Sequence, residues 1–438
     1  MEKNEIIKIL EDWNFWKKDL ETGFVRPHYL NKLKGFLANS HIIVITGARR
    51  SGKSFIMRQL AKSLIEEKVD RNSILLVNFE DPRFTGLDAK TLQKIYEVYL
   101  EFLNPKQKPY IFLDEIQEVK DWEKWVRTAH ELNKARIIIS GSNAKLLSRE
   151  LGTLLTGRHL NLTVFPLSFR EYLAFKNIGL TDRLDYINQE IVIKRLLREY
   201  LEGGSFPEVV LAKDGKEILL NYFEDIINKD IIKRYKIRKT EQLANLTKFY
   251  LSNISSLVTF SSLERALMFS SDTIEKFSHY LNEAYMLYFV KRFSFKVKEQ
   301  EKSPKKVYAI DTGLSNTIGF RFSENLGRLS ENLVFLELER RRCLNPDLEF
   351  YYYKDIHHRE VDFVIKENLE VRQLIQVCWK IDKLKTKDRE IRILIKTMEA
   401  FRLKEGLVIT EDYEQEEDFN GKRINYIPLW KWLLGEDL

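Results

Sequence analysis

One stretch decides the fold: Ile42-Ile43-Val44-Ile45-Thr46-Gly47-Ala48-Arg49-Arg50-Ser51-Gly52-Lys53-Ser54. Its first four residues are all β-branched, and such a continuous run predicts a strand that is buried on both faces. The residues from Gly47 to Ser54 match the pattern G-x-x-x-x-G-K-[ST], and helical spacing of apolar residues follows from Lys53 to about Glu67. A buried strand, a glycine-rich turn and a helix in this order predict a phosphate-binding loop.

Each residue type in this loop has a physical role. Gly47 and Gly52 let backbone N–H groups close around a phosphate, and the helix N-terminus adds partial positive charge. Lys53 is predicted to bridge the β- and γ-phosphates of ATP, and Ser54 to bind Mg²⁺ through its hydroxyl. The residues between the two glycines are also expected to line the nucleotide: Ala48, Arg49, Arg50 and Ser51.

A second buried strand ends in two acids, in the sequence Tyr110-Ile111-Phe112-Leu113-Asp114-Glu115. Asp114 is predicted to hold Mg²⁺ through water, and Glu115 to act as the general base that polarises the attacking water. The alternative is that the two acids only begin a helix, as an N-cap and a first-turn acid. The presence of the phosphate-binding loop favours the catalytic interpretation.

Two further positions are weaker candidates. The strand Ile137 to Ser140 runs into Gly141-Ser142-Asn143, where a side chain such as that of Asn143 could contact the γ-phosphate or the water. Turn chemistry alone would also place Ser and Asn at such a tip. Arg158, after Thr156-Gly157, could reach the γ-phosphate of a neighbouring subunit, or it is an ordinary surface arginine.

Outward from the loop, strand and helix patterns alternate as far as Ser140, which predicts an α/β fold with a parallel sheet covered by helices on both faces. Amphipathic helical patterns precede the loop, and after Phe165-Pro166 the strand patterns stop. Helical patterns then occupy roughly Ser168 to Tyr235 and Thr240 to about Val297, ending in the apolar run Met286 to Val290. Strand patterns return from Val307 to Ile409, and the acidic run Glu411 to Asp418 is predicted to be a solvated loop.

Composition limits the class of protein. The 438 residues carry 72 basic and 65 acidic side chains, a formal net charge of +7 that permits nucleic acid as a partner without requiring it. Only Cys343 and Cys378 are present, so a disulfide framework is excluded. No apolar stretch approaches the roughly 18 residues that span a bilayer. A cytoplasmic protein without a membrane partner is expected.

The ordered set of motifs resembles the prokaryotic AAA-type ATPases that carry a C-terminal domain of unknown function, DUF4143. It includes the loop, the Asp114-Glu115 pair, the polar tip, Thr156-Gly157-Arg158 and four later motifs: Phe165-Pro166-Leu167-Ser168-Phe169-Arg170-Glu171-Tyr172, Gly203-Gly204-Ser205-Phe206-Pro207-Glu208, Asp311-Thr312-Gly313-Leu314 and Glu360-Val361-Asp362-Phe363-Val364. The resemblance implies that the polar-tip strand lies between the other two strands. It also implies that Ser142 or Asn143 is the sensor and that Arg158 is an arginine finger.

The resemblance further implies a division of the chain into four parts: a P-loop core with N-terminal helices at 1–172, a helical lid at 173–239, a winged-helix-like segment at 240–300 and a restriction-endonuclease-like α/β domain at 301–438. An active nuclease of that last fold needs a helix acid, a strand acid and E-x-K on the next strand. Glu331 and Asp362 match the first two positions. The third position has Gln376-Val377-Cys378, which weakens both metal binding and water activation.

The sequence leaves alternative interpretations of that domain open. Lys380 is predicted to lie on the same strand face as Gln376, because side chains alternate with period two, and it could replace the missing lysine. Alternatively the fold serves for binding, with the basic stretch Lys380 to Arg392 facing DNA phosphates, or this stretch is only a solvated helix face.

Three functions follow from these observations. The first is Mg²⁺-dependent binding and hydrolysis of ATP that moves the lid and the C-terminal modules, with DNA as a candidate partner and a homo-oligomer as a candidate assembly. The second is an ATP-regulated DNA nuclease, and the third a nucleotide-gated interaction protein with little turnover. Glu115 favours the first function over the third, and Gln376-Val377-Cys378 disfavours the second.

Overall fold

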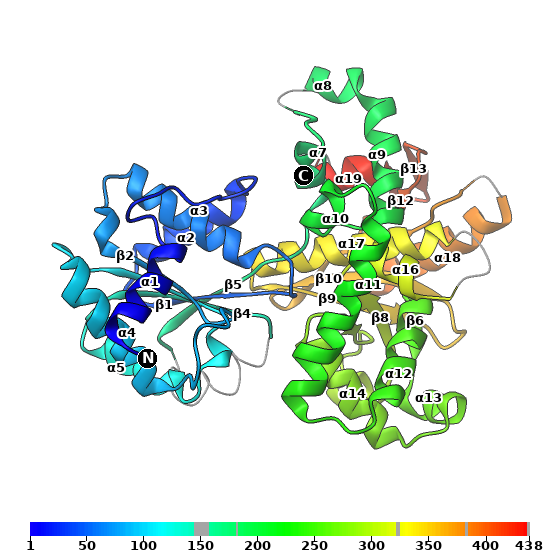
Figure 1. The fold of residues 1–438 in the computed structure, drawn as a ribbon. Helices are drawn as coiled ribbons and strands as arrows, with labels where there is room; N and C mark the ends of the chain where they lie inside the picture. Colours follow the sequence, from blue (N-terminus) through cyan, green and yellow to red (C-terminus); the bar gives the residue numbers. More distant parts are fainter. Residues whose placement is uncertain (144–156, 181–182, 321–324, 382–383, 436–438) are drawn as a thin grey trace. The chain divides into compact units, whose positions relative to one another are not determined.

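The computed structural model describes residues 1–143, 157–180, 183–320, 325–381 and 384–435 (Figure 1). The chain divides into two compact units, Met1–Val164 and Phe165–Leu438. The first unit is built on one parallel sheet, and the second contains a six-stranded and a three-stranded sheet. The finer division at residues 172, 239 and 300 stays a prediction.

The first unit contains a five-stranded sheet in the order β2-β3-β4-β1-β5, and all neighbouring strands in it are parallel. The strands are β1 (Ile42–Thr46), β2 (Ile74–Asn78), β3 (Tyr110–Asp114), β4 (Arg136–Gly141) and β5 (His159–Thr163). The predicted place of the polar-tip strand β4, between the loop strand β1 and the acid strand β3, is confirmed. The carboxyl ends of β1, β3 and β4 therefore meet at one edge of the sheet.

Helices cover both faces of this sheet, as the alternating pattern predicted (Figure 1). Ile42 and Val44 belong to one core, with residues of α1, α4 and α5, whereas Ile43 and Ile45 belong to a second core, with residues of α2 and α3. Because successive strand residues point to opposite faces, a strand with two buried faces needs the continuous apolar run seen in β1. The helices are α1 (Lys3–Trp13), α2 (Pro27–Leu37), α3 (Lys53–Glu66), α4 (Ala89–Leu103) and α5 (Trp122–Glu131), with short 3₁₀ turns at Arg71–Ser73 and Ile116–Glu118.

The second unit begins with helices: α7 (Phe169–Phe175), α8 (Arg183–Asn188), α9 (Glu190–Gly203), α10 (Pro207–Leu211), α11 (Gly215–Asp225), the π-helical Ile226–Lys233 and α12 (Thr240–Ser252). A three-stranded antiparallel sheet in the order β6-β8-β7 follows, made of β6 (Ser256–Val258), β7 (Leu287–Val290) and β8 (Lys305–Ala309). Two helices lie in the chain between β6 and β7: α13 (Phe260–Leu267) and α14 (Ser271–Glu283).

The expectation that no strand lies between Phe165 and Val307 is therefore wrong. The apolar run at Leu287–Val290 is a strand because α14 ends before it, and Tyr285 takes a left-handed backbone conformation with φ 58°. Strands of three or four residues are too short to show a clear period of two.

The rest of the second unit is a six-stranded mixed sheet in the order β13-β14-β12-β11-β10-β9. Its core includes Val361, Leu374 and Val408 from the strands and Leu394 and Met398 from α18. The strands are β9 (Leu348–Lys354), β10 (Glu360–Glu367), β11 (Glu370–Val377), β12 (Glu405–Thr410), β13 (Gln415–Phe419) and β14 (Lys422–Pro428), and the helices are α15 (Val297–Lys302), α16 (Thr312–Ile318), α17 (Leu326–Leu344), α18 (Leu384–Phe401) and α19 (Leu429–Leu434).

The acidic run differs from its predicted form, since Gln415–Phe419 is the edge strand β13, paired antiparallel with β14. The prediction of a solvated loop is wrong for this half of the run. Charged side chains on an edge strand discourage pairing with another chain, so an edge strand can have the composition of a loop.

Two of the later sequence motifs meet at a junction around Asp311. The carboxylate of Asp311 is fully buried and accepts hydrogen bonds from the backbone N–H of Ser205 at 2.6 Å, the hydroxyl of Ser205 at 2.7 Å and the N–H of Leu314 at 3.0 Å. Gly204 has φ +87°, and a Cβ added there would lie 2.3 Å from Asp311 Oδ1. This Asp311 junction joins the end of α9 to the start of α16. A Cβ at Gly313 would lie 2.4 Å from the backbone oxygen of Gly203, so both motifs need glycine.

Candidate active site

The phosphate-binding loop connects β1 to α3 and depends on its two glycines. Gly47 has φ +141°, and a Cβ there would lie 2.1 Å from the backbone oxygen of Val164. Gly52, the N-cap of α3, has φ +99°, a conformation that other residues rarely adopt. The loop therefore has this backbone course only with glycine at both positions.

Lys53 lies inside the loop and is 4% exposed. Its Nζ donates to the backbone oxygens of Gly47 at 3.2 Å and Ala48 at 3.1 Å, and it lies 3.6 Å from Oε1 of Glu115. The ammonium group is thus placed between the loop and the acid pair, where a phosphate could replace the carbonyl groups as its partner.

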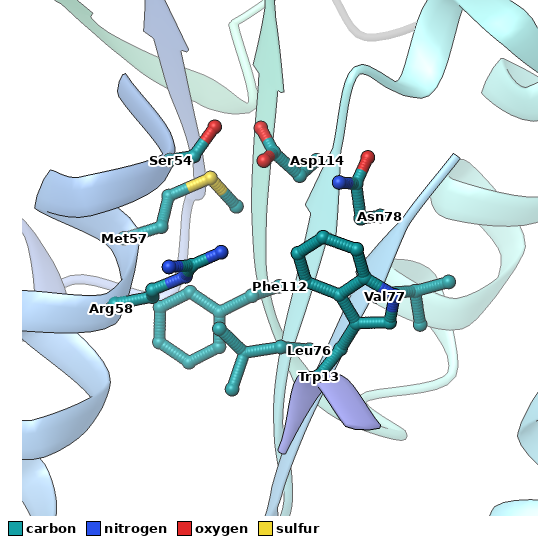
Figure 2. A pocket seen from close by; sticks show the side chains of 9 residues that line it. All are labelled: Trp13, Ser54, Met57, Arg58, Leu76, Val77, Asn78, Phe112 and Asp114. Atoms are coloured by element: carbon teal, nitrogen blue, oxygen red, sulfur yellow. The ribbon is translucent and has the colours of Figure 1, made fainter. Parts of the chain in front are cut away.

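Asp114 and Glu115 are both buried at the carboxyl end of β3. The Ser140 hydroxyl of β4 joins them, since it donates to Oδ1 of Asp114 and accepts from the N–H of Glu115 at 3.0 Å. The hydroxyl of Ser54 also bonds to Asp114. Figure 2 shows the side chains of Ser54 and Asp114 facing the same space at the rim of a pocket.

The two carboxyl groups have opposite pKa shifts. Burial, and then the nearby charge of Glu115, raise the pKa of Asp114 above its ordinary value. Burial would also raise the pKa of Glu115, but Lys53, Gln117 and Arg49 outweigh it and hold the pKa below its ordinary value. Glu115 is therefore the carboxylate that the site keeps charged, as a general base requires.

The side-chain oxygen atoms at this rim fit Mg²⁺, which prefers hard oxygen ligands and keeps several bound waters. The pocket is lined by Trp13, Ser54, Met57, Arg58, Leu76, Val77, Asn78, Phe112 and Asp114. Only its upper rim is rich in side-chain oxygen, contributed by Ser54, Asp114 and Asn78 (Figure 2). These residues come from α3 and from the ends of β3 and β2.

The sequence analysis did not assign roles to three residues that support the site. Ser140 joins the two acids, Gln117 donates to Glu115, and the buried Arg26 donates to the backbone oxygen of Ser51 at 3.0 Å. The polar end of β4 was a signal for Ser140. No local pattern marks Arg26, because it precedes β1 in the chain and reaches the phosphate-binding loop only through the tertiary fold.

The weaker candidates are placed as follows. Ser142 and Asn143 are buried just after β4, at the same edge as the acids, and both make interactions there. Arg158 lies just before β5, is 43% exposed and forms an ion pair with Glu131 of α5. Thr156 lies outside the described residues. The sensor role of Asn143 and the finger role of Arg158 stay predictions.

Comparisons with known proteins agree with this geometry. A family model described as an AAA domain matches residues 39–173, and models of two domains of unknown function, DUF8612 and DUF4143, match residues 194–325 and 326–432. An uncharacterized protein of Methanocaldococcus jannaschii is 33% identical over 412 residues, which cover 91% of this chain and 89% of that protein. The chain belongs to the AAA-type P-loop ATPase family with a C-terminal DUF4143 domain.

Other matches include an uncharacterized protein of Haemophilus influenzae, which is 31% identical over 417 residues, 92% of this chain and 98% of that protein. Among solved structures, a Walker-type ATPase of Pyrococcus abyssi aligns with 70% of this chain and 99% of its own, at 13% identity and a TM-score of 0.44. Among the described residues, no helix is long and apolar enough to cross a membrane.

In the DUF4143 segment, Glu331, Asp362 and Gln376 come together as the sequence indicated. Glu331 lies on α17, Asp362 on β10 and Gln376 on β11, and the amide oxygen of Gln376 accepts from the N–H of Asp362 at 3.2 Å. Lys380 does not join them. It is exposed, and β11 ends at Val377, so the alternation that was expected to align Lys380 with Gln376 stops before it is reached.

Lys306 of β8, to which the sequence analysis assigned no role, also lies in this cluster. Its Nζ is 2.8 Å from Glu331 Oε1, 2.5 Å from Glu360 Oε1 and 2.8 Å from Asp362 Oδ1. Burial would lower the pKa of Lys306, but Asp362 and Glu331 outweigh it and raise the pKa well above its ordinary value. Burial raises the pKa of Glu331 to about 8.

Proposed function

We propose that this chain binds ATP together with Mg²⁺ at Gly47–Ser54 and hydrolyses it, with Glu115 as the general base. One observation carries the proposal. Lys53, Ser54, Asp114 and Glu115 converge at one edge of the sheet, with Nζ of Lys53 at 3.6 Å from Glu115. Phosphoryl transfer needs such positioned charges, because its transition state spreads negative charge over the phosphate oxygens.

Each residue of the site has a separate proposed role. In this proposal Lys53 would bind the β- and γ-phosphates, and Ser54 and Asp114 would hold Mg²⁺, which would neutralise charge on the phosphates. Glu115 orients the attacking water and accepts its proton, and Asn143 contacts the γ-phosphate or that water. Movement of the lid at 173–239 and of the modules after it is the output that we propose for the cycle.

Arg158 is proposed to act in a homo-oligomer, on the γ-phosphate held by a neighbouring subunit. Support for this comes from its exposure and from its partner. Its ion pair with Glu131 is on the surface, with 43% and 42% of the two side chains exposed, and a surface pair is weak enough to be exchanged for a phosphate.

The test of the proposed activity is ATP turnover by the full chain. We expect Lys53→Ala to abolish measurable turnover and to weaken ATP binding by about tenfold or more, because the phosphates lose a charge-assisted hydrogen bond. Lys62→Ala, on the same helix, is the matched control and is expected to keep the parent values. Turnover in Lys53→Ala equal to that of the parent would contradict the proposal, and ATP binding without turnover in the parent would favour a nucleotide-gated interaction protein.

A second candidate function is binding of DNA by the winged-helix-like segment. Two observations favour it. Helices α13 and α14 are joined by a three-residue turn beside the sheet β6-β8-β7, an arrangement typical of helix-turn-helix readers. The connection from Lys291 to Lys305 has six basic and two acidic side chains. The other basic stretch, Lys380–Arg392, contains residues 382 and 383, which lie outside the described part of the chain.

We expect the full chain to shift a labelled duplex at low salt. Replacing three exposed lysines, Lys296, Lys298 and Lys302, with Ala should lower the affinity and reduce the slope of log K against log salt by about 2 to 3, since each phosphate contact contributes about 0.9. Alanine at Lys8, Lys90 and Lys106, exposed lysines of the first unit, is the control with the same change in charge. An unchanged slope in the first variant would contradict this assignment.

A further inference from the structure

The ammonium group of Lys306 occupies the centre of a carboxylate cluster in the second unit. Glu331 of α17 and both Glu360 and Asp362 of β10 each place one oxygen within 2.8 Å of Nζ. The Lys306 side chain is 2% exposed. Lys306 lies within the DUF8612 match, whereas its three partners lie within the DUF4143 match. The cluster therefore forms only when the two segments pack together.

Two of the three carboxylates, those of Glu331 and Asp362, are held in place by groups other than Lys306. The hydroxyl of Tyr308 donates to Glu331 at 2.7 Å, and the N–H of Val377 donates to Oδ2 of Asp362 at 2.9 Å. The amide of Gln376 bonds to the backbone of Asp362 and, through Nε2, to Glu390 at 2.8 Å. Supporting hydrogen bonds of this kind usually orient the ligands of metal ions.

The position of Nζ is one that a divalent cation would take. Carboxylate oxygens bind Ca²⁺ at about 2.3–2.6 Å, and the three oxygens here surround Nζ at 2.8, 2.5 and 2.8 Å. With the ammonium present there is no room for a second cation, and its charge would repel one. In the described part of the chain, no three His, Cys, Asp or Glu residues are arranged to hold a metal ion as they stand.

We propose that Lys306 is a built-in cation that replaces a divalent metal ion in this cluster. The DUF4143 segment consequently binds no Mg²⁺ or Mn²⁺ at Glu331, Glu360 and Asp362, and it cannot cleave nucleic acid by a metal-dependent route. Removing the ammonium group should leave three carboxylates, two of them held by other hydrogen bonds, that accept a divalent cation. An active nuclease of the fold implied by the resemblance requires a metal ion, and here the residues present do not fit one because Lys306 fills the site.

Mn²⁺ binding to the nucleotide-free full chain, measured by electron paramagnetic resonance, tests this proposal. All variants carry Ser54→Ala, so that the phosphate-binding loop contributes little. We expect Lys306→Ala to bind one equivalent of Mn²⁺ more than the parent, since three carboxyl groups are left without the ammonium group. Adding Asp362→Asn to that variant should abolish the gain. Lys305→Ala, which removes the neighbouring lysine, should produce no gain.

Melting temperatures accompany the titration, because an uncompensated charge in the interior destabilises a fold strongly. Lys306→Ala should melt below the parent, and Mn²⁺ should restore part of the loss only when Asp362 is intact. Lys306→Met, which removes the same charge but keeps the volume of the side chain, should also melt below the parent and should bind no added Mn²⁺. The proposal is overturned if Lys306→Ala folds and gains no Mn²⁺ site.

A further outcome does not depend on folding of the Lys306→Ala variant. The parent with Ser54→Ala and its Asp362→Asn derivative are compared directly. We expect both to take up the same amount of Mn²⁺, because the cluster binds none in the presence of Lys306. Uptake by the parent that is lost in Asp362→Asn would show that the native cluster holds a metal, and would overturn the proposal.

Discussion

Replacing Glu115 with Gln is expected to lower the rate of ATP hydrolysis by about 100-fold or more while ATP still binds. The substitution keeps the size and one oxygen of the side chain, but it removes the charge that Lys53, Gln117 and Arg49 stabilise at this position. Without that charge the attacking water loses the group that accepts its proton. Turnover under saturating ATP gives the rate, and equilibrium binding of ATP is measured separately.

Glu118→Gln is the matched control for this experiment. Glu118 lies in the same short turn, Ile116–Glu118, but its side chain is exposed. The control should hydrolyse ATP at close to the parent rate. Hydrolysis at the parent rate by Glu115→Gln would show that another group activates the water, whereas a loss of ATP binding would show that Glu115 acts mainly on the ground state.

Gly204→Ala is expected to destabilise the second unit by roughly 2–5 kcal/mol, the combined cost of a left-handed backbone and an overpacked interior. Gly204 has φ +87°, and the added Cβ would lie 2.3 Å from Oδ1 and 2.8 Å from Oδ2 of Asp311. Asp311 cannot move away without losing its three hydrogen bonds to Ser205 and Leu314. Denaturant unfolding, monitored on a probe in residues 165–438, measures the effect.

Gly203→Ala provides an internal comparison one residue away. A Cβ at Gly203 meets nothing within 4 Å, and its φ is outside the left-handed region. This variant should unfold within about 0.5 kcal/mol of the parent, as surface substitutions usually do. Similar stability of Gly203→Ala and Gly204→Ala would mean that the Asp311 junction is not a rigid contact.

Most of the fold of the first unit was predictable because the strands β1 to β4 are buried on both faces, whereas the edge strand β5 is mostly not buried and was not predicted. Such strands give continuous apolar runs, and the predicted strand at residues 74–78 coincides with β2. The alternation of these runs with amphipathic helices left the parallel sheet as the consistent architecture. Shorter or charged strands gave no such signal. The strands β6, β7 and β13 were missed because an edge strand of three to five residues needs neither a continuous apolar run nor a clear alternation of apolar and polar residues.

The candidate active site was largely visible in the sequence, since the residues of a phosphate-binding loop are contiguous. Lys53 and Ser54 are fixed by the turn and helix that contain them. Asp114 and Glu115 could be paired with the loop because the carboxyl ends of parallel strands meet at one edge. The structure added Ser140, whose hydroxyl contacts both acids from the adjacent strand.

The sequence by itself determined the parallel sheet of the first unit and the phosphate-binding loop, because both follow from local patterns of burial and turn chemistry. Only the tertiary structure decided the nature of the DUF4143 cluster. Lys306 is 25 residues from Glu331 and 56 from Asp362 along the chain, so no local spacing links them. In the sequence, a lysine of a solvated linker cannot be told from a lysine of a buried ion pair. Only the packing of β8 against α17 and β10 distinguishes the two.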